Sequence, residues 1–410
     1  NGGQEYSYYA SGMVWGAPAL ADLDNDQDLE IIFTTENVNN GDLYAIHHNG
    51  ELVEGFPANI NEKMMVGPAV GDLEGDGIMD IVIATWGENI IALDAFGNIK
   101  EGFPYVSSKR FNSPPTLADI DGNGTFEIIA GNDDGFLHIL YFDGTEMNSF
   151  DTGDDIRGGI SIADLNDDGS LELLFVGYDD MLHVWNPILN QELEGWPLDM
   201  GSNSLSGPIT ADLDNDGDLE VITAMKDGTV YAMHHDGSFF PNFPMNILGI
   251  ESTPAVEDLD NDGDYELVFG TTQGLQVIDI KTDKGSHGSW KMHRGNQYRT
   301  GLYGSTILSL SPKVGIVPNK FNVSSNYPNP FNPITKIDIQ TIKNENLNVS
   351  IFDASGRHIN TLVNQIQSPG IYTISWYGKD QNGINMPSGV YFIQIKSGKN
   401  LITKKIALIK

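Results

Sequence analysis

A nine-residue acidic segment occurs six times between Asp22 and Glu266, and successive copies begin 45 to 50 residues apart. The copies read DLDNDQDLE, DLEGDGIMD, DIDGNGTFE, DLNDDGSLE, DLDNDGDLE and DLDNDGDYE. A fixed period of this length is typical of repeat architectures, in which each copy is one small structural unit that stacks on its neighbours. The chain is therefore first of all an array of six similar units.

Oxygen-bearing side chains occupy positions one, three, five and nine of every copy. Of these 24 positions, 22 hold a carboxylate and two hold an amide. A hard cation such as Ca²⁺ binds about six to eight such oxygens, whereas carboxylates crowded without a cation raise one another's pKa and push the loop apart. The pattern predicts about six calcium sites. The predicted ligands are Asp22, Asp24, Asp26 and Glu30; Asp72, Glu74, Asp76 and Asp80; Asp119, Asp121, Asn123 and Glu127; Asp164, Asn166, Asp168 and Glu172; Asp212, Asp214, Asp216 and Glu220; and Asp258, Asp260, Asp262 and Glu266.

The neighbouring residues distinguish this loop from an EF-hand. Five copies carry glycine at position six, where the chain must turn sharply, and the first copy departs with Gln27. An EF-hand needs a glutamate at position twelve and helical flanks. Position twelve here holds Phe, Ile, Ala, Phe, Thr and Phe, and each loop runs into a short apolar segment such as EIIFTT or DIVIAT. Short apolar runs beside Gly and Asp clusters predict buried strands.

Each period has room for four strands. An apolar segment precedes the loop, a strand follows it, a third strand comes after a Gly-containing turn, and most repeats close with a Pro-marked segment such as EGFP or EGWP. Four short strands in about 40–50 residues, repeated, are typical of a β-propeller whose blades are small antiparallel sheets. We therefore predict an all-β fold, with residues 1–303 forming a six-bladed β-propeller.

From Met13 to Tyr303 the repeats resemble the FG-GAP or VCBS family, the calcium-loop propellers also found in integrin α-subunit heads. The resemblance implies structural calcium in a loop between the first two strands of each blade, and no particular chemistry. The sixth repeat ends in SWKMHRGNQYRTGLY, which is similar to the closing outer strand of related bacterial propellers. A chain that starts at Asn1 without Met or a signal peptide is expected to be a processed or clipped piece, so six or seven blades both stay open.

The charge balance changes sharply after the last repeat. Residues 1–303 carry 53 acidic and 11 basic side chains, whereas residues 304–410 carry 4 and 11. Six bound Ca²⁺ ions would leave the first domain at about −30, which excludes nucleic acid and anionic lipid as partners. Residues 304–320 are predicted to be a linker. The chain has no cysteine and no apolar run of the ~18–20 residues needed for a membrane span.

Residues 321–410 are predicted to form a small antiparallel β-sandwich, Ig-like in architecture. Alternating apolar residues (Ile351, Ile374, Trp376, Tyr391 and Ile393) are separated by Ser-Gly and Asn-Gly turns. The segments YPNPFNP (327–333), SGVYFIQI (388–395) and the final KKIALIK resemble the type A C-terminal sorting domain of the type IX secretion system. The resemblance implies the type IX secretion machinery as a partner, and a secreted or outer-surface location in a Gram-negative, Bacteroidetes-like bacterium. An Ig-like adhesive module is the alternative.

Motifs of common enzymes (HExxH, GxSxG, P-loop) were not found. The histidines His47, His48, His234 and His235 stand at equivalent places of repeats one and five, as do His138 and His183 in repeats three and four, which favours structural roles over a zinc site. Tryptophans at recurring places are expected mainly to pack between blades rather than stack on sugars: Trp15, Trp86, Trp185 and Trp196.

Two classes of function remain open. The first is a non-enzymatic binding or scaffold module for a surface glycan or a protein ligand. The second is a calcium-dependent surface enzyme, either a polysaccharide lyase or hydrolase, or the tail of a peptidase. The candidate acids for the second class lie outside the calcium loops: Asp133, Asp134, Asp179 and Asp180.

Overall fold

A computed structural model describes residues 6–303 except 27, 39, 248, 250, 251 and 283–289, together with 321–323, 329, 331, 335–341, 343, 345–367, 370–379, 386–398 and 400–409. The chain divides into two compact units, Asn1–Gly304 and Ser305–Lys410. The predicted linker, residues 304–320, lies outside the described residues, as does Gln27. The described residues form strands, turns and irregular segments. They contain no helix that is long and apolar enough to cross a membrane.

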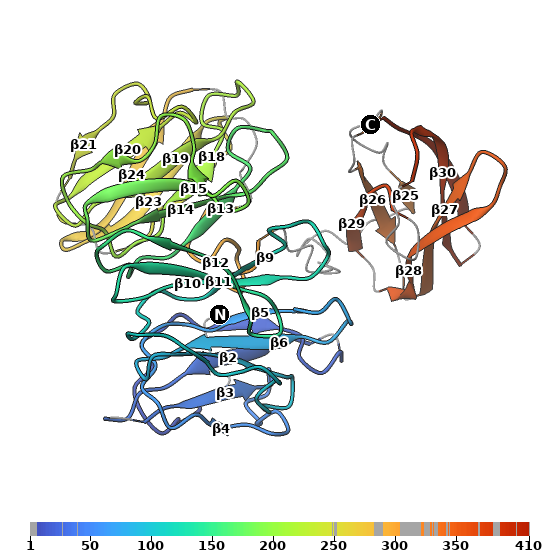
Figure 1. The fold of residues 1–410 in the computed structure, drawn as a ribbon. Helices are drawn as coiled ribbons and strands as arrows, with labels where there is room; N and C mark the ends of the chain where they lie inside the picture. Colours follow the sequence, from blue (N-terminus) through green and yellow to red (C-terminus); the bar gives the residue numbers. More distant parts are fainter. Residues whose placement is uncertain are drawn as a thin grey trace. The chain divides into compact units, whose positions relative to one another are not determined.

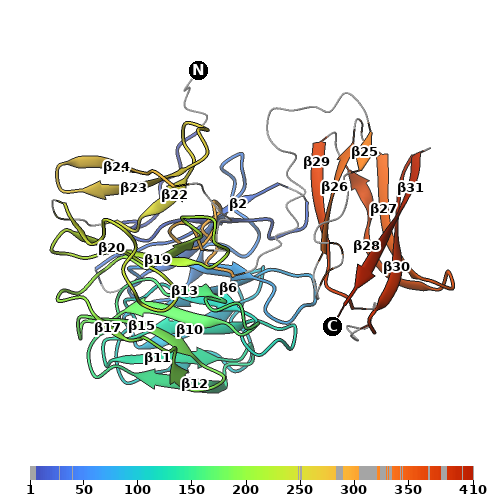
Figure 2. The ribbon, with the colours of Figure 1, turned by 90° about the horizontal axis from the view of Figure 1, so that it is seen from above.

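The first unit is a six-bladed β-propeller, and its blades follow one another in chain order, from blue to gold in Figure 1 and seen from above in Figure 2. Blades one to three comprise β1 (Ala19–Ala21), β2 (Glu30–Thr34), β3 (Asp42–Ile46) and β4 (Ala58–Asn59); β5 (Ala69–Gly71), β6 (Asp80–Ala84), β7 (Asn89–Leu93) and β8 (Tyr105–Val106); and β9 (Thr116–Ala118), β10 (Glu127–Gly131), β11 (Phe136–Leu140) and β12 (Glu146–Asp151). Every neighbouring pair within a blade is antiparallel.

Blades four to six repeat the arrangement with small differences. They comprise β13 (Ser161–Ala163), β14 (Glu172–Val176), β15 (Met181–Asn186), β16 (Gln191–Glu192) and β17 (Leu198–Asp199); β18 (Ile209–Ala211), β19 (Glu220–Ala224), β20 (Thr229–Met233) and β21 (Met245–Asn246); and β22 (Ala255–Glu257), β23 (Tyr265–Thr271) and β24 (Gly274–Ile280). Both β16 and β17 pair with β15. Four strands were expected in every repeat, but the sixth blade shows three among the described residues.

The core of the propeller lies between consecutive blades. Ile32 and Leu43 of the first blade, for example, cluster with Ile81, Ile83 and Ile91 of the second. Corresponding clusters join blades two and three, three and four, four and five, and five and six. Because both faces of a middle blade are covered, its second strand is apolar without alternation, and β6, β10, β14 and β19 are buried at every residue.

The outer face of the sixth blade is different. Leu275 and Val277 of β24 are 70% and 49% exposed, whereas Leu43 and Ala45 at the same places in β3 are fully buried. Among the described residues, no hydrophobic cluster joins the sixth blade to the first. The first blade is covered instead by Tyr6, Tyr8 and Ala10, which pack against Phe33, Tyr44 and Ile46.

Residues 290–303 run along the first strands of the blades and not along an outer edge. The expectation of a closing outer strand for SWKMHRGNQYRTGLY is therefore wrong. Backbone N–H groups of five first strands donate to carbonyls of this segment: Thr210 to Trp290, Val256 to Lys291, Leu20 to Tyr298, Val70 to Thr300 and Leu117 to Gly301, at 2.7–3.1 Å. The first strands expose an unpaired edge toward the axis, and the segment satisfies it.

Arg294 is the central side chain of this axial segment, and it is only 4% exposed. Its Nη1 donates to the carbonyl of Pro115 at 2.8 Å, and its Nη2 donates to the carbonyl of Pro68. One guanidinium thus connects the second and third blades at the axis. The five donors of an arginine suit it to several carbonyls at once.

The second unit is an Ig-like sandwich of two sheets. They are β25 (Asn322–Val323), β26 (Thr335–Thr341) and β29 (Gly370–Trp376), and β28 (His358–Gln367), β27 (Glu345–Asp353), β30 (Gly389–Ser397) and β31 (Asn400–Leu408). The predicted alternation is confirmed, because the five apolar residues named above all lie in the core. Of the YPNPFNP segment, only Asn329 and Phe331 are described. Phe331 is buried and exchanges backbone hydrogen bonds with Ala407 and Ile409 at 2.9 Å, beside the last strand.

Candidate metal sites

Each nine-residue loop joins the first strand of a blade to the second. Position one directly follows the first strand, and position nine lies at the start of the second strand. The position-nine carboxylates are buried in all six blades, at 0–6% exposure. Position five is exposed throughout, and position three is exposed or half-buried. The loop therefore has a buried acidic end and an exposed acidic rim.

The position-nine carboxylate closes every loop. In all six, one of its oxygens accepts a hydrogen bond from the backbone N–H of position two, at 2.6–3.2 Å. The pairs are Leu23 with Glu30, Leu73 with Asp80, Ile120 with Glu127, Leu165 with Glu172, Leu213 with Glu220 and Leu259 with Glu266. This bond holds the two ends of the loop together and leaves the second carboxylate oxygen for another partner.

The backbone of the loop turns at two positions. Position six has a φ of 88° to 104° at its five glycines. Position four also has a positive φ in every copy, from 53° to 75°, at Asn25, Gly75, Gly122, Asp167, Asn215 and Asn261. The sequence analysis did not identify position four, although the recurrence of Asn, Gly and Asp there was a readable signal, since these residues tolerate left-handed backbone.

The position-five oxygen has the same backbone partner in all six loops. It accepts from the N–H of position seven at 2.7–3.3 Å: Asp28, Ile78, Thr125, Ser170, Asp218 and Asp264 are the donors. Position one accepts from loop amides as well, for example from Gly124 N–H to Asp119 at 3.0 Å and from Gly169 N–H to Asp164 at 2.9 Å. These bonds orient the side chains inward without a cation.

In several of the loops, predicted ligands lie close enough to share one ion. In each group below, one ligand atom per residue lies within 4.8 Å of the others: Asp22, Asp24 and Glu30; Asp119, Asp121 and Glu127; Asp212, Asp214 and Glu220; and Asp258, Asp260 and Asp262. In the loop of residues 164–172, Asn186 donates to Glu172 at 3.0 Å, and Asn166 donates to Asp168 at 3.0 Å. In the loop of residues 72–80, Glu74 and Asp80 both accept a hydrogen bond from Lys100 Nζ.

Several loop oxygens are buried without a hydrogen-bond partner. They are Glu127 Oε1 and Asp119 Oδ1 in the third blade, and Asp212 Oδ1 and Asp214 Oδ1 in the fifth. Burial, together with the charges of Asp121 and Asp119, raises the pKa of Glu127 to about 7. Burial likewise raises the pKa of Glu220 to about 7. A buried carboxylate oxygen without a partner is costly, and a divalent cation held by these oxygens would remove that cost, so the residues fit such an ion.

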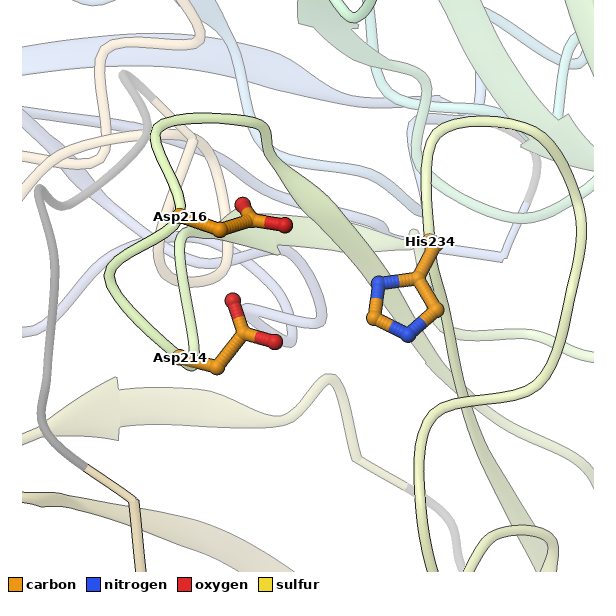
Figure 3. Close-up of side chains that lie close together, drawn as sticks. All are labelled: Asp214, Asp216 and His234. Carbon is orange, nitrogen blue, oxygen red and sulfur yellow. The ribbon is translucent and has the colours of Figure 1, made fainter.

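In the first and fifth blades, a histidine contacts the position-nine glutamate of the loop. Figure 3 shows Asp214, Asp216 and His234 facing one another, and their ligand atoms lie within 4.8 Å. His234 Nδ1 lies 3.0 Å from Glu220 Oε1, and His47 Nδ1 lies 3.1 Å from Glu30 Oε1 at the same place in the first blade. The sequence analysis placed these histidines at equivalent positions but did not predict that they would contact position nine.

His138 and His183 lie outside the loops, on the third strands of their blades. His183 is buried between Asp179 at 3.0 Å and Glu192 at 2.7 Å. Burial works to lower its pKa, but the hydrogen bonds to both carboxylates outweigh it and raise the pKa to about 9. His138 Nδ1 lies 2.8 Å from Glu146. Each histidine has its own carboxylate partner within its own blade.

Three of the four acids considered for an enzyme, Asp133, Asp134 and Asp179, have side-chain partners in the structure. Asp133 accepts from Arg110 at 2.5 Å, from Arg157 at 2.8 Å and from Asn112 at 2.8 Å. Asp134 accepts from Ser108 at 2.5 Å. These acids stabilise the connections between blades, as Asp179 does within the fourth blade.

The tryptophans divide into two groups. Trp185 and Trp196 are buried in clusters between blades. Trp15 is 56% exposed, and Trp86 has two cations close to its ring, with Lys63 Nζ and Arg110 Cζ at 4.1 and 4.2 Å from the ring centroid. Both cations lie within the distance of a cation–π interaction. The expectation of packing between blades holds for the first pair.

The fold and the loops define a β-propeller repeat protein with a C-terminal Ig-like domain. The FG-GAP-like repeat family matches residues 6–83 and 212–269, and the FlgD Ig-like domain family matches residues 333–400. The chain thus contains FG-GAP-like repeats. A comparison with curated proteins found no match.

Similar solved structures come from several organisms. The biofilm matrix protein Bap1 of V. cholerae is 16% identical, with 98% of this chain and 68% of that chain covered and a TM-score of 0.45. BamB from Moraxella catarrhalis is 13% identical, with 67% and 87% covered and a TM-score of 0.40. PorZ, a surface component of the type IX secretion system of Porphyromonas gingivalis, is 15% identical, with 94% and 51% covered and a TM-score of 0.35.

Proposed function

We propose that the propeller is stabilised by calcium ions held in its nine-residue loops. The observation that carries the proposal is the set of buried carboxylate oxygens without hydrogen-bond partners at Glu127, Asp119, Asp212 and Asp214. Positions one, three, five and nine would hold the ion, with positions one and nine at the buried end. The ion would supply positive charge to side chains that otherwise repel one another, and it would link the first two strands of a blade.

Replacing Asp214 with Ala is expected to remove one calcium ion and leave the others bound. Each loop belongs to one blade, and repeat proteins are stabilised mainly by contacts between neighbours. The measurement is the number of bound ions by calorimetric titration and by native mass spectrometry, for the parent chain and the variant. Thr145→Ala is the control, because Thr145 is exposed in the turn between β11 and β12, outside the nine-residue loops, and is not a predicted ligand. Loss of all ions in the Asp214 variant would contradict independent sites.

We also infer that the propeller acts as a binding or scaffold module, for a surface glycan or a protein, and not as an enzyme. The support is that Asp133, Asp134 and Asp179, which are acids outside the loops, accept hydrogen bonds from side chains of the blades. Three exposed apolar side chains, Met13, Val14 and Trp15, lie together in sequence before the first blade and offer a contact surface.

A glycan array and a pull-down with the calcium-loaded protein test the proposed binding role. Failure to retain any ligand in both assays, together with cleavage of an anionic polysaccharide, would favour the enzyme.

We propose that residues 321–410 direct export by the type IX secretion machinery to the outer cell surface. The support is the set of motifs YPNPFNP, SGVYFIQI and KKIALIK. The first and last of these are in contact, because Asn329 Oδ1 accepts from Ala407 N–H at 2.9 Å and Phe331 hydrogen-bonds to Ala407 and Ile409. The sorting signal would then be a composite surface of the sandwich.

Deleting residues 321–410 is expected to abolish release of the propeller from the cell, while expression stays unchanged. Cell fractionation of a type IX-competent host measures this, with a strain that lacks the secretion system as the reference. A fluorescent protein that carries an export signal for the inner membrane and residues 304–410 should reach the medium or the surface. Equal export with and without the C-terminal unit would overturn the assignment.

A further inference from the structure

We propose that the second loop, residues 72–80, carries its own cation in the ammonium group of Lys100 and does not bind calcium. The inference rests on the proposed calcium function of the other loops. The expectation was six equivalent calcium sites. In this proposal the second loop is neutralised by the ammonium group of Lys100, and the other loops bind calcium.

Lys100 Nζ lies between two predicted ligands of this loop. It is 2.7 Å from Glu74 Oε2 at position three and 2.8 Å from Asp80 Oδ1 at position nine. The side chains of Lys100 and Asp80 are 13% and 3% exposed. A lysine that donates to two carboxylates at these distances forms charge-assisted hydrogen bonds in a largely buried setting. The ammonium thus takes up oxygens that a metal ion would need.

The fold does not require a lysine at this place. The backbone N–H of Lys100 donates to Ala92 of the third strand at 2.9 Å, and the residues with the same bond in other blades are apolar. They are Val53 with Ala45, Leu193 with Val184 and Phe240 with Ala232, at 2.8–3.0 Å. Val53 and Phe240 are 5% and 3% exposed. Lysine can occupy such a position when its carbon chain packs there and its charge reaches a polar group, and here that group is the loop.

Further oxygens of the second loop accept hydrogen bonds from its backbone. Asp72 accepts from the N–H groups of Gly75, Asp76 and Gly77 at 2.9, 3.0 and 2.7 Å. The second oxygen of Asp80 accepts from Leu73 N–H at 3.2 Å. No atom of this fully described loop is among the buried oxygens that lack a partner, whereas the third and fifth loops have two each.

Electrostatic repulsion from Lys100 also opposes calcium binding in the second loop. A calcium ion in the second loop would share Glu74 and Asp80 with an ammonium group a few ångströms away, and two cations at that distance repel each other strongly in a partly buried site. The second loop is also the one copy with aspartate at position nine. We infer that Lys100 keeps this blade closed when calcium is scarce.

The test is the number of calcium ions bound by the parent chain and by four variants. The parent is expected to bind one ion fewer than Lys100→Val, which restores the residue of the first blade. Asp76→Ala, in the second loop, should leave the count of the parent unchanged, whereas Asp214→Ala should lower it by one. Lys100→Arg keeps a charge and should also match the parent. Far-ultraviolet circular dichroism in excess calcium verifies that each variant is folded.

The outcomes separate this inference from the proposed function. If Asp76→Ala lowers the count by one, or if Lys100→Val does not raise it, Lys100 is not the resident cation, although calcium binding stands. If the parent and every variant bind no calcium at all, the proposed function itself fails. If Lys100→Val does not fold, the Asp76→Ala count still decides, because that variant keeps Lys100 and removes a predicted ligand of the second loop.

Discussion

Removal of calcium is expected to lower the melting temperature of the propeller by at least about 10 °C. A site that binds only the folded state contributes about 2.7 kcal/mol when free calcium is one hundred times its Kd. A loss of about 1 kcal/mol shifts the melting temperature of a domain of 150–250 residues by about 2–4 °C. Several sites lost together therefore have a large effect. Buried carboxylates such as Glu127 are then left with unpartnered oxygens and add to the loss.

The C-terminal unit provides the internal control. Residues 304–410 contain four acidic side chains and none of the nine-residue loops, so its own transition is expected to move little. Differential scanning calorimetry of the whole chain, with EDTA and again after calcium is restored, measures both transitions in one sample. Recovery on restoring calcium, and not magnesium, would identify the ion. A propeller transition that EDTA leaves in place would contradict the metal argument.

Replacing Arg294 with Met is expected to lower the free energy of unfolding by about 2–5 kcal/mol, because two buried carbonyls lose their donor and each unsatisfied buried acceptor costs about 1–3 kcal/mol. Met retains much of the apolar stem but leaves the carbonyls of Pro68 and Pro115 without donors at the axis. The measurement is the melting temperature and the denaturant midpoint in saturating calcium, which keeps the loops filled.

Arg299→Met is the matched control for that variant. Arg299 lies five residues away in the same axial segment, but it is exposed. Its replacement is expected to change stability by less than about 0.5 kcal/mol, the usual range for surface substitutions. Equal effects of the two substitutions would show that the segment needs no buried guanidinium.

The strands and loops were predictable because their signals are local. Each nine-residue copy contains both the oxygen-bearing side chains predicted as ligands and the residues that let the backbone turn, and the apolar run after it is short enough to be a strand. The predicted alternation of the C-terminal unit was recognisable for the same reason. Asn25 and its equivalents at position four were equally local and were missed only because their positive φ was not considered.

The axial segment shows the limit of this reasoning. Residues 290–303 resemble an outer strand in sequence, yet their carbonyls accept hydrogen bonds from five first strands, and Arg294 reaches Pro68, which lies 226 residues earlier. No local pattern encodes that partner. The exposure of Leu275 and Val277 was equally unpredictable, because their sequence matches the buried third strands of other blades.

The repeat, the position of each loop and its oxygen-bearing side chains could be predicted from the sequence, because they depend on residues within nine positions of one another. The partners of the loop oxygens could not, since they follow from the tertiary fold: Lys100 in the second blade, His47 and His234 in the first and fifth, and no partner for Glu127 Oε1 in the third. These partners come from the third strand or from the turn after it, and the pairing of strands brings them to the loop.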